Sequence, residues 1–248
     1  MTLRHLALAL PLLALAGSAR ADRPNFAFAY EPKTMAAGEL ELESYSTASV
    51  RYDWLANDHT YGWIHQVELE YGVTDRFDLA MYQVFSADQW NGFKLRARYR
   101  PADYGALPVD VMFYGELIFG REGEMAFEEK LVVGKIIGKV ALTLDSTLEQ
   151  ENLFGEREYK WSEAIGAGYV LTPQVTAGLE AQARMGWEPK TVYGAGTKLE
   201  FADPAFYAGP TLSFATEKFF WNVNFSARTS DDDNDPKYLF RIKMGFPL

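Results

Sequence analysis

Hydrophobic and polar residues alternate along most of the chain after residue 37. Residues 93–100 place Phe, Leu, Ala and Tyr at odd positions and Lys or Arg at even positions. Residues 109–119 and 238–248 follow a similar two-residue period. Successive side chains of a β-strand point to opposite faces, so this period predicts strands with one apolar face and one polar face.

Thirteen segments carry such a strand-like pattern. They are residues 38–53, 61–72, 76–86, 92–101, 107–119, 125–136, 139–150, 158–171, 174–186, 190–201, 205–215, 218–228 and 237–248. Segment 190–201 is the weakest, because Gly194, Gly196 and Lys198 interrupt its apolar face, and we interpret it as part of a long extracellular excursion. Bacterial single-chain barrels have an even number of strands. We therefore predict an all-β, transmembrane, antiparallel up-and-down β-barrel of 12 strands, with 14 as the alternative.

The N-terminus has the features of a secretory signal peptide. Arg4 and His5 precede an apolar run, Leu6 to Ala16, and the run is followed by a small-residue ending, Ser18 to Ala21. The run is shorter than the roughly 20 apolar residues that a membrane-spanning helix needs. We predict a cleaved signal peptide at 1–21, a periplasmic N-terminal segment at 22–37 and the barrel at 38–248.

The rest of the chain excludes several other classes of protein. The most apolar later stretch, residues 131–142, is interrupted by Lys135 and Lys139, which disfavours a spanning helix. In lipid every backbone polar group must be paired within the protein, which leaves a closed barrel as the way to cross. The net charge of −10 falls to −12 when Arg4 and Arg20 leave with the signal peptide, and this disfavours nucleic acid as a partner.

The sequence offers few residues that could serve in catalysis or bind a metal ion. The chain has no cysteine, and His59 and His65 are the histidines of the mature chain, so no cofactor is implied. We interpret His65 as an interfacial residue on the outer face rather than a catalytic base. The acidic loop 231–235 does not fit a calcium-binding loop, because Pro236 stands where the turn glycine belongs.

Several short segments carry a family resemblance. They are Phe26–Tyr30 with Gly38–Glu41, Glu70–Phe77, Glu129–Val133, Tyr207–Leu212 and Phe240–Phe246. Together they resemble an uncharacterised family of predicted bacterial outer-membrane β-barrel proteins of porin or transporter type. The resemblance implies a 12-strand layout in the outer membrane. From the barrel itself, its loops and its apolar last strand we expect outer-membrane lipid, lipopolysaccharide and the barrel-assembly machinery as partners. The resemblance implies no particular activity.

The hairpins predict which inward-facing charges meet. Residues opposite each other across a tight turn have position numbers with a constant sum, and such pairs interact. This rule predicts the pairs Lys130–Asp145, Arg98–Asp110 and Arg100–Asp78, with Glu70 also opposite Asp78. The predicted charge cluster of the lumen, as a candidate pore lining, comprises Glu70, Asp78, Lys94, Arg96, Arg98, Arg100, Asp110, Glu116, Lys130 and Asp145.

The first and last strands must pair to close the barrel. If Leu40 and Leu42 face lipid, the acidic residues between and beside them face the lumen, next to two basic residues of the last strand. We therefore predict a seam joined by ion pairs. Its members are Glu39, Glu41, Glu43, Arg241 and Lys243.

Two interpretations of the inward charges remain open. In one, the basic side chains 94, 96, 98 and 100 guide small solutes through a narrow passive channel. In the other, acidic and basic side chains neutralise each other and fill the interior of a structural barrel, or of one that binds lipopolysaccharide or an external partner. A membrane-embedded hydrolase is a third interpretation, and no motif supports it.

Overall fold

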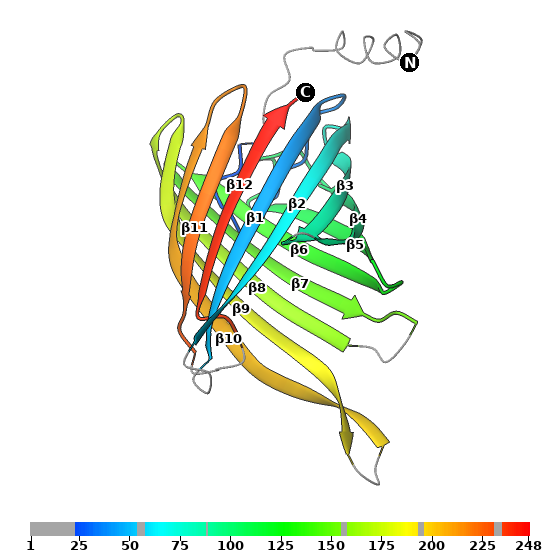
Figure 1. Ribbon diagram of the computed structural model, residues 1–248. Helices are drawn as coiled ribbons and strands as arrows, with labels where there is room; N and C mark the ends of the chain where they lie inside the picture. The colour runs from blue at the N-terminus through cyan, green and yellow to red at the C-terminus, as the bar shows by residue number, and fades with distance from the viewer. Residues whose placement is uncertain (1–22, 54–57, 88, 155–157, 193–195, 231–234) are drawn as a thin grey trace, which may run out of the picture.

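The computed structural model describes residues 23–53, 58–87, 89–154, 158–192, 196–230 and 235–248. In this part of the chain twelve antiparallel strands form one closed barrel, in which β1 pairs with both β2 and β12 (Figure 1). This confirms the predicted fold and strand number. The strands are β1 Leu40–Asp53, β2 Asp58–Thr74, β3 Phe77–Ser86, β4 Gln89–Tyr99, β5 Asp110–Gly120, β6 Met125–Ile137, β7 Val140–Glu151, β8 Glu158–Thr172, β9 Val175–Val192, β10 Gly196–Ala215, β11 Phe220–Arg228 and β12 Tyr238–Pro247.

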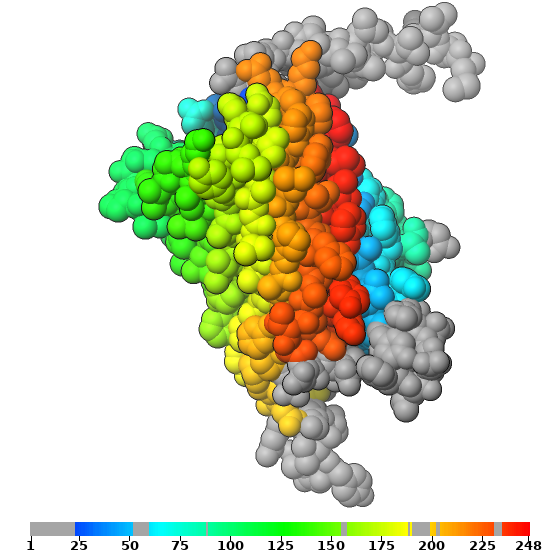
Figure 2. Space-filling model, turned by 90° about the vertical axis from the view of Figure 1, so that its left-hand side faces the viewer, coloured from blue at the N-terminus to red at the C-terminus, as the bar shows by residue number. Residues whose placement is uncertain are grey.

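The two faces of the wall have the predicted character. On β4, Leu95 and Tyr99 are 44% and 48% exposed on the outside, whereas Arg96 and Arg98 are buried inside. Figure 2 shows the outer wall, where neighbouring strands lie side by side as slanted bands. No helix among the described residues is long and apolar enough to cross a bilayer. An apolar outer face around a polar lumen is the arrangement of a transmembrane β-barrel.

The connections differ between the two ends of the barrel. The turn end carries the C-terminus and mostly short connections, such as 75–76, 138–139 and 173–174. The connection 100–109 between β4 and β5 is longer and lies at this same end. The opposite end, here called the loop end, carries the connections 121–124 and 229–237 among others. Both chain termini of the barrel lie at the turn end (Figure 1).

Segment 190–201 is not a thirteenth strand. Its ends extend β9 and β10, and Lys190 pairs with Lys198 in a hairpin that projects beyond the barrel at the loop end (Figure 1). Strand β8 pairs with β9 up to Trp187, and β11 pairs with β10 from Tyr207 onwards. The far part of the hairpin therefore pairs with itself alone, which is why its inner face needs no polar pattern.

The last strand stays paired to its end. Glu41 is in register with Pro247, and the Leu248 amide donates to the Leu40 carbonyl at 2.8 Å. Proline has no backbone N–H group and so cannot donate to the ladder at Pro247. The ladder continues because the next residue supplies the N–H group.

Residues 23–37 lie inside the barrel, in the half of the lumen next to the turn end (Figure 1). We call this segment the plug. Its residues form two buried clusters with the inner wall: Phe26 and Ala29 with β7 and β8, and Phe28 with β10 and β12. Residues 22–37 were predicted as a periplasmic N-terminal segment. In the described part of this segment, the side chains from Phe26 to Ala29 and of Met35 are buried in the lumen, whereas Ala36 and Ala37 are exposed at its end. The predicted signal peptide, 1–21, lies outside the described residues.

Two glycines make room for the plug. A Cβ atom at Gly166 would lie 2.8 Å from the ring of Phe26, and one at Gly168 would lie 3.4 Å from the same ring. Phe26 is 1% exposed. The absence of side chains at these inward positions of β8 is what lets an aromatic ring lie flat against the wall.

The self-paired hairpin predicts that its far part is dispensable for folding. We expect a variant in which residues 188–201 are replaced by a two-residue turn to refold as a barrel, because the removed residues pair with no other strand. The measurement is the shift in gel mobility between unheated and boiled samples, with the intact chain as control. Loss of that shift would contradict the self-contained hairpin.

Candidate functional site

The plug is attached to the wall mainly through its backbone. Glu180 on β9 is buried, and its carboxylate accepts hydrogen bonds from the amides of Ala27, Phe28 and Ala29 at 2.9, 2.7 and 2.8 Å. A carboxylate that accepts several backbone N–H groups is well solvated by the protein itself. Glu180 therefore satisfies three consecutive plug amides without needing any particular plug side chain.

Further wall side chains hold the middle of the plug. The Tyr30 amide donates to Asp145 at 2.7 Å, and the Thr143 hydroxyl donates to the Tyr30 carbonyl at 2.5 Å. Lys130 places its ammonium 4.6 Å from the Tyr30 ring centroid and 4.8 Å from that of Tyr114, and it pairs with Glu128 on its own strand. Lys130 and Asp145, both predicted as lumen charges, thus lie on either side of one plug residue.

The end of the plug is bound by β3 and β4. The Met35 amide donates to Asp78 at 3.1 Å, and Arg100 donates to the Thr34 hydroxyl at 2.8 Å. Arg100 also donates to the carbonyl of Asp75 in the adjoining turn at 2.5 Å. The predicted partner of Arg100 was Asp78, so its position near the turn end was foreseen but its contacts were not.

Charged side chains of β2, β3 and β4 form a buried network, and one of its members, Asp78, also contacts the plug. Arg96 pairs with Glu68 at 2.5 Å and with Glu70 at 2.7 Å, and it lies 3.4 Å from Asp78. Arg98 pairs with Glu70 and, at 2.9 Å, with Asp78. Each of these two arginines therefore bridges two or three carboxylates, so the middle of the stripe that suggested a solute track is paired with acidic side chains of the wall.

The same network explains how four acidic side chains tolerate each other across β1 and β2. Glu41 is directly opposite Glu70, and Glu43 is directly opposite Glu68. Like charges in these positions destabilise a sheet. The carboxylates of Glu43, Glu68 and Glu70 come within 4.8 Å of one another, a spacing that could suit a metal ion. Cationic side chains of β4 and β12 supply the counter-charge instead.

The seam contains one of the ion pairs that the sequence predicted. Lys243 on β12 lies 3.1 Å from Glu43 on β1, whereas Arg241 donates to the Thr47 hydroxyl at 2.8 Å and forms no ion pair with a described carboxylate. Glu41 is buried at the seam. Glu39 precedes β1, and its carbonyl accepts from the Gly72 amide at 3.0 Å.

The hairpin rule placed each predicted charge on the correct face but in the wrong register. Lys130 is opposite Thr147 rather than Asp145, and Arg98 is opposite Tyr114 rather than Asp110. Asp78 is opposite Arg98 on one side and Gly72 on the other, not Arg100 and Glu70. Each predicted partner differs from the observed one by two or four residues. Because these shifts are even, the side chains still face inward.

Two further predicted charges have local partners. Asp110 accepts a hydrogen bond from the Gly105 amide at 2.6 Å and lies 3.5 Å from Lys135, both near the turn end. Glu116 pairs with Lys94 at 2.8 Å and accepts from the Tyr114 hydroxyl at 2.7 Å. Lys94 and Glu116 lie on the loop side of the plug, where both line a cavity.

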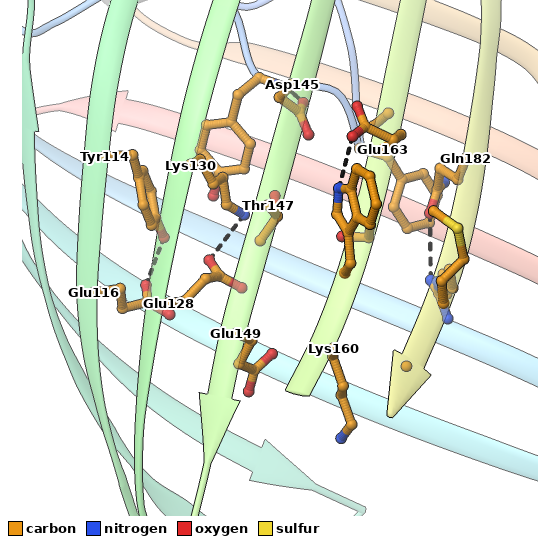
Figure 3. A pocket seen from close by; sticks show the side chains of 18 of the residues that line it. Tyr114, Glu116, Glu128, Lys130, Asp145, Thr147, Glu149, Lys160, Glu163 and Gln182 are labelled. Carbon is orange, nitrogen blue, oxygen red and sulfur yellow. Dashed lines mark hydrogen bonds and ion pairs between the residues drawn. The ribbon is translucent and has the colours of Figure 1, made fainter. Parts of the chain in front are cut away.

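A polar cavity of about 550 Å³ lies between the plug and the loop end. Phe28 and Tyr30 of the plug line one part, and Gly186 and Asp235 line another near the loop end. Figure 3 shows its acidic wall, where Glu116, Glu128, Asp145 and Glu149 come from β5, β6 and β7. The cavity is within the size range of small-molecule sites.

The outer face holds a histidine contact that sequence reasoning did not foresee. Ser46 Oγ lies 2.8 Å from His65 Nδ1, across the β1–β2 pair. No acidic or amide side chain of the described residues bonds to the other ring nitrogen, and a serine–histidine hydrolase needs such a group to orient the base. His65 faces outward as predicted. The side chain of His59 lies outside the described residues.

Other residues of the lumen were missed because no local pattern marks them. The plug and Glu180 gain their roles from contacts between segments more than 100 residues apart, as in the Glu180–Ala27 bond. Arg184 gains its position from Tyr207 on the neighbouring strand. The signal that could have revealed the plug is the apolar run Phe26–Tyr30, which has no partner strand in the sequence pattern. The matching signal in the wall is the pair of glycines at inward positions of β8, Gly166 and Gly168.

Comparison with known proteins supports the fold. No protein-family model matches the sequence, and no curated protein matches it significantly. An outer-membrane channel from Pseudomonas putida F1 is similar in structure, with a TM-score of 0.62 and 13% identity over 87% of this chain and 97% of that one. The NanC porin is also similar, with a TM-score of 0.58 and 9% identity over 84% of this chain and 100% of that one. The KdgM porin has a TM-score of 0.56 and 10% identity over 84% of this chain and 99% of that one.

These likenesses and the apolar outer face define the class of protein. The chain has the fold of a bacterial outer-membrane β-barrel of the porin and channel type. Its apolar outer face is the surface that a barrel of this fold turns towards lipid. The predicted resemblance to outer-membrane barrels is thereby confirmed at the level of fold.

The buried network predicts a large loss of stability when one bridge is removed. We expect Arg96→Met to lower the free energy of unfolding by about 3–5 kcal/mol, because Glu68 and Glu70 lose a buried counter-charge. Urea unfolding followed by tryptophan fluorescence measures it. The matched control is Lys160→Met, whose exposed pair with Glu151 is worth under about 1 kcal/mol. Equal effects of the two variants would contradict the bridging role.

The seam pair predicts rescue by charge reversal. We expect Lys243→Glu to reduce the yield of folded barrel, because the new carboxylate would face Glu43 across β1 and β12. The double variant Glu43→Lys/Lys243→Glu should recover part of that yield, measured as the heat-shifted gel fraction after refolding. A double variant as defective as the single one would show that the pair does not join the seam.

Proposed function

We propose that this protein is a narrow passive channel for small solutes, blocked at the turn end by its own N-terminal segment. The observation that carries the proposal is the polar cavity of about 550 Å³ that runs from the plug residue Phe28 towards Asp235 near the loop end. A barrel with a purely structural role has no need of a polar space of this size. The loop end would face the outside of the cell and the turn end the periplasm.

The attachment of the plug supports a blocked channel rather than a permanently filled barrel. The contacts that hold it are largely hydrogen bonds between backbone amides and the carboxylates of Glu180, Asp145 and Asp78. Both partners of such a bond can be hydrated when they separate, so the net contribution of each bond is only about 1.5–3 kcal/mol. Displacement of the plug would therefore expose a wet, charged passage.

The alternative is a non-conducting barrel whose loops contact lipopolysaccharide or an external partner. The close packing of Phe26 against Gly166 and Gly168 is the observation that favours it, because a fixed plug gives a sealed lumen. A hydrolase is a weaker candidate, since the Ser46–His65 contact lacks an orienting group among the described residues. Lipopolysaccharide and the barrel-assembly machinery stay predicted partners.

Planar-bilayer recordings separate the channel from the sealed barrel. We expect a variant lacking residues 24–36 to give discrete current steps several-fold larger than those of the intact chain. Gly166→Leu should shift the currents in the same direction, because a side chain there would collide with Phe26.

The matched control is Ala167→Leu, one position along on the outward face of β8, which should leave the currents unchanged. Each variant is first checked for the heat-dependent gel shift of a folded barrel. A correctly folded plug-deletion variant that stays silent would overturn the channel and favour the sealed barrel.

A further inference from the structure

The cations that line the cavity fall into two groups. Lys94, Lys130 and Lys160 each have an acidic partner, at 2.8, 2.9 and 2.6 Å respectively. Arg184 on β9 and Arg241 on β12 also line the cavity, yet neither forms an ion pair with a carboxylate of the described chain. These two arginines are therefore positive charges that the wall leaves uncompensated.

Both arginines rest against aromatic rings of one buried cluster. The Arg184 guanidinium lies 5.1 Å from the ring centroid of Tyr207, and that of Arg241 lies 4.0 Å from the ring centroid of Phe28. Phe28 and Tyr207 pack together in that cluster. The rings thus bring the two guanidinium groups, from strands far apart in sequence, to the same side of the cavity and beside the plug.

A third donor lies next to them. Gln182 is buried, and its Oε1 accepts from Arg184 at 3.3 Å, whereas its Nε2 has no hydrogen-bond partner (Figure 3). An unpaired buried N–H group costs about 1–3 kcal/mol. This wall therefore presents several N–H donors and lacks the acceptor that would satisfy them.

Most acidic side chains of the cavity lie on other strands. Glu116, Glu128, Asp145 and Glu149 belong to β5, β6 and β7. Among the described residues, strands β9 to β12 themselves contribute no acidic side chain to the lining, and Asp235, in the connection before β12, lines it near the loop end. The wall formed by β5 to β7 is therefore the more negative one, and an anion that enters is attracted towards Arg184 and Arg241.

We propose that Arg184, Arg241 and Gln182 form a binding site for the carboxylate of a small organic solute. Guanidinium N–H groups match the two oxygens of a carboxylate, and the amide of Gln182 adds a further donor. The remainder of the solute would occupy the polar space towards Tyr114 and Glu149. This inference rests on the proposed channel, because it names the class of solute that the channel admits.

The competing role of the two arginines is to support the aromatic cluster alone. Arg184 and Arg241 would then act through their contacts with Tyr207 and Phe28, and no anion would bind. The two roles differ in one measurable respect, which is whether a carboxylate binds the folded barrel more tightly than a neutral molecule of similar shape.

Calorimetric titration of the full-length mature protein, folded in detergent micelles, tests the site. The probes are glucuronate and glucose, which differ in one carboxylate. We expect saturable binding of glucuronate and none of glucose. The variant Arg184→Gln/Arg241→Gln should weaken glucuronate binding at least about tenfold, because charge-assisted hydrogen bonds are lost.

Lys160→Gln is the matched control, because it removes a cation of the same cavity that already has the partner Glu151. Its affinity for glucuronate should stay within about twofold of the unchanged protein. If the double variant does not fold, Arg184→Gln alone replaces it, since this side chain is half-buried and its removal leaves the contact of Arg241 with Phe28 in place. Equal binding of the two probes, or undiminished binding by a folded arginine variant, would overturn the site.

Planar-bilayer recordings distinguish a failure of the carboxylate site from a failure of the proposed channel. A barrel that conducts after plug removal but binds no glucuronate would refute the carboxylate site and leave the channel standing. A barrel that binds glucuronate through the two arginines and remains silent would refute the channel and leave the site standing.

Discussion

The occupation of one half of the lumen by residues 23–37 is the constraint on which the rest of the structure depends. A backbone segment placed inside a barrel brings amides that no ladder satisfies, and the wall must supply their partners. Glu180, Asp145 and Asp78 do so with carboxylates. On β2 and β4, the side chains of Glu68, Glu70 and Arg96 have no exposed surface, and charges buried to that extent need paired partners. The bridging of Glu68 and Glu70 by Arg96 meets that need.

The fold was predictable because each of its determinants is local. The period of two sets the face of every side chain, and a closed antiparallel ring requires an even number of strands. Segment 190–201 has no inward polar stripe because it extends past the ring, and that irregularity marked it correctly as an excursion. Registers were less predictable. The irregularity between Gly72 and Thr74 shifts the β2–β3 pairing by one residue, and the long 100–109 connection does not fix how β4 and β5 pair.

The site was predictable only in part. The inward charges could be identified from alternation, but whether a charge is neutralised depends on neighbours two strands away and on exact register. Lys94 and Arg96 look alike in the sequence, yet one lines the open cavity and the other is enclosed by carboxylates. Arg241 was assigned to the seam from its position in the last strand. Its contact with Phe28 depends on the plug, which alternation cannot place.

The plug is held by two kinds of contact. Each of its backbone bonds to a carboxylate contributes about 1.5–3 kcal/mol net. Burial of Phe26 against β8 contributes about as much, because exposing an aromatic ring of that size costs about 1.5–3 kcal/mol. The balance between a blocked and an open lumen therefore depends on both kinds of contact, and the polar ones are more numerous. Phe28 adds a second link, since its ring joins the plug to Arg241 and to the positive wall of the cavity. An anion bound at that wall would compete for the guanidinium that holds Phe28, so occupation of the cavity and attachment of the plug are coupled through a single side chain.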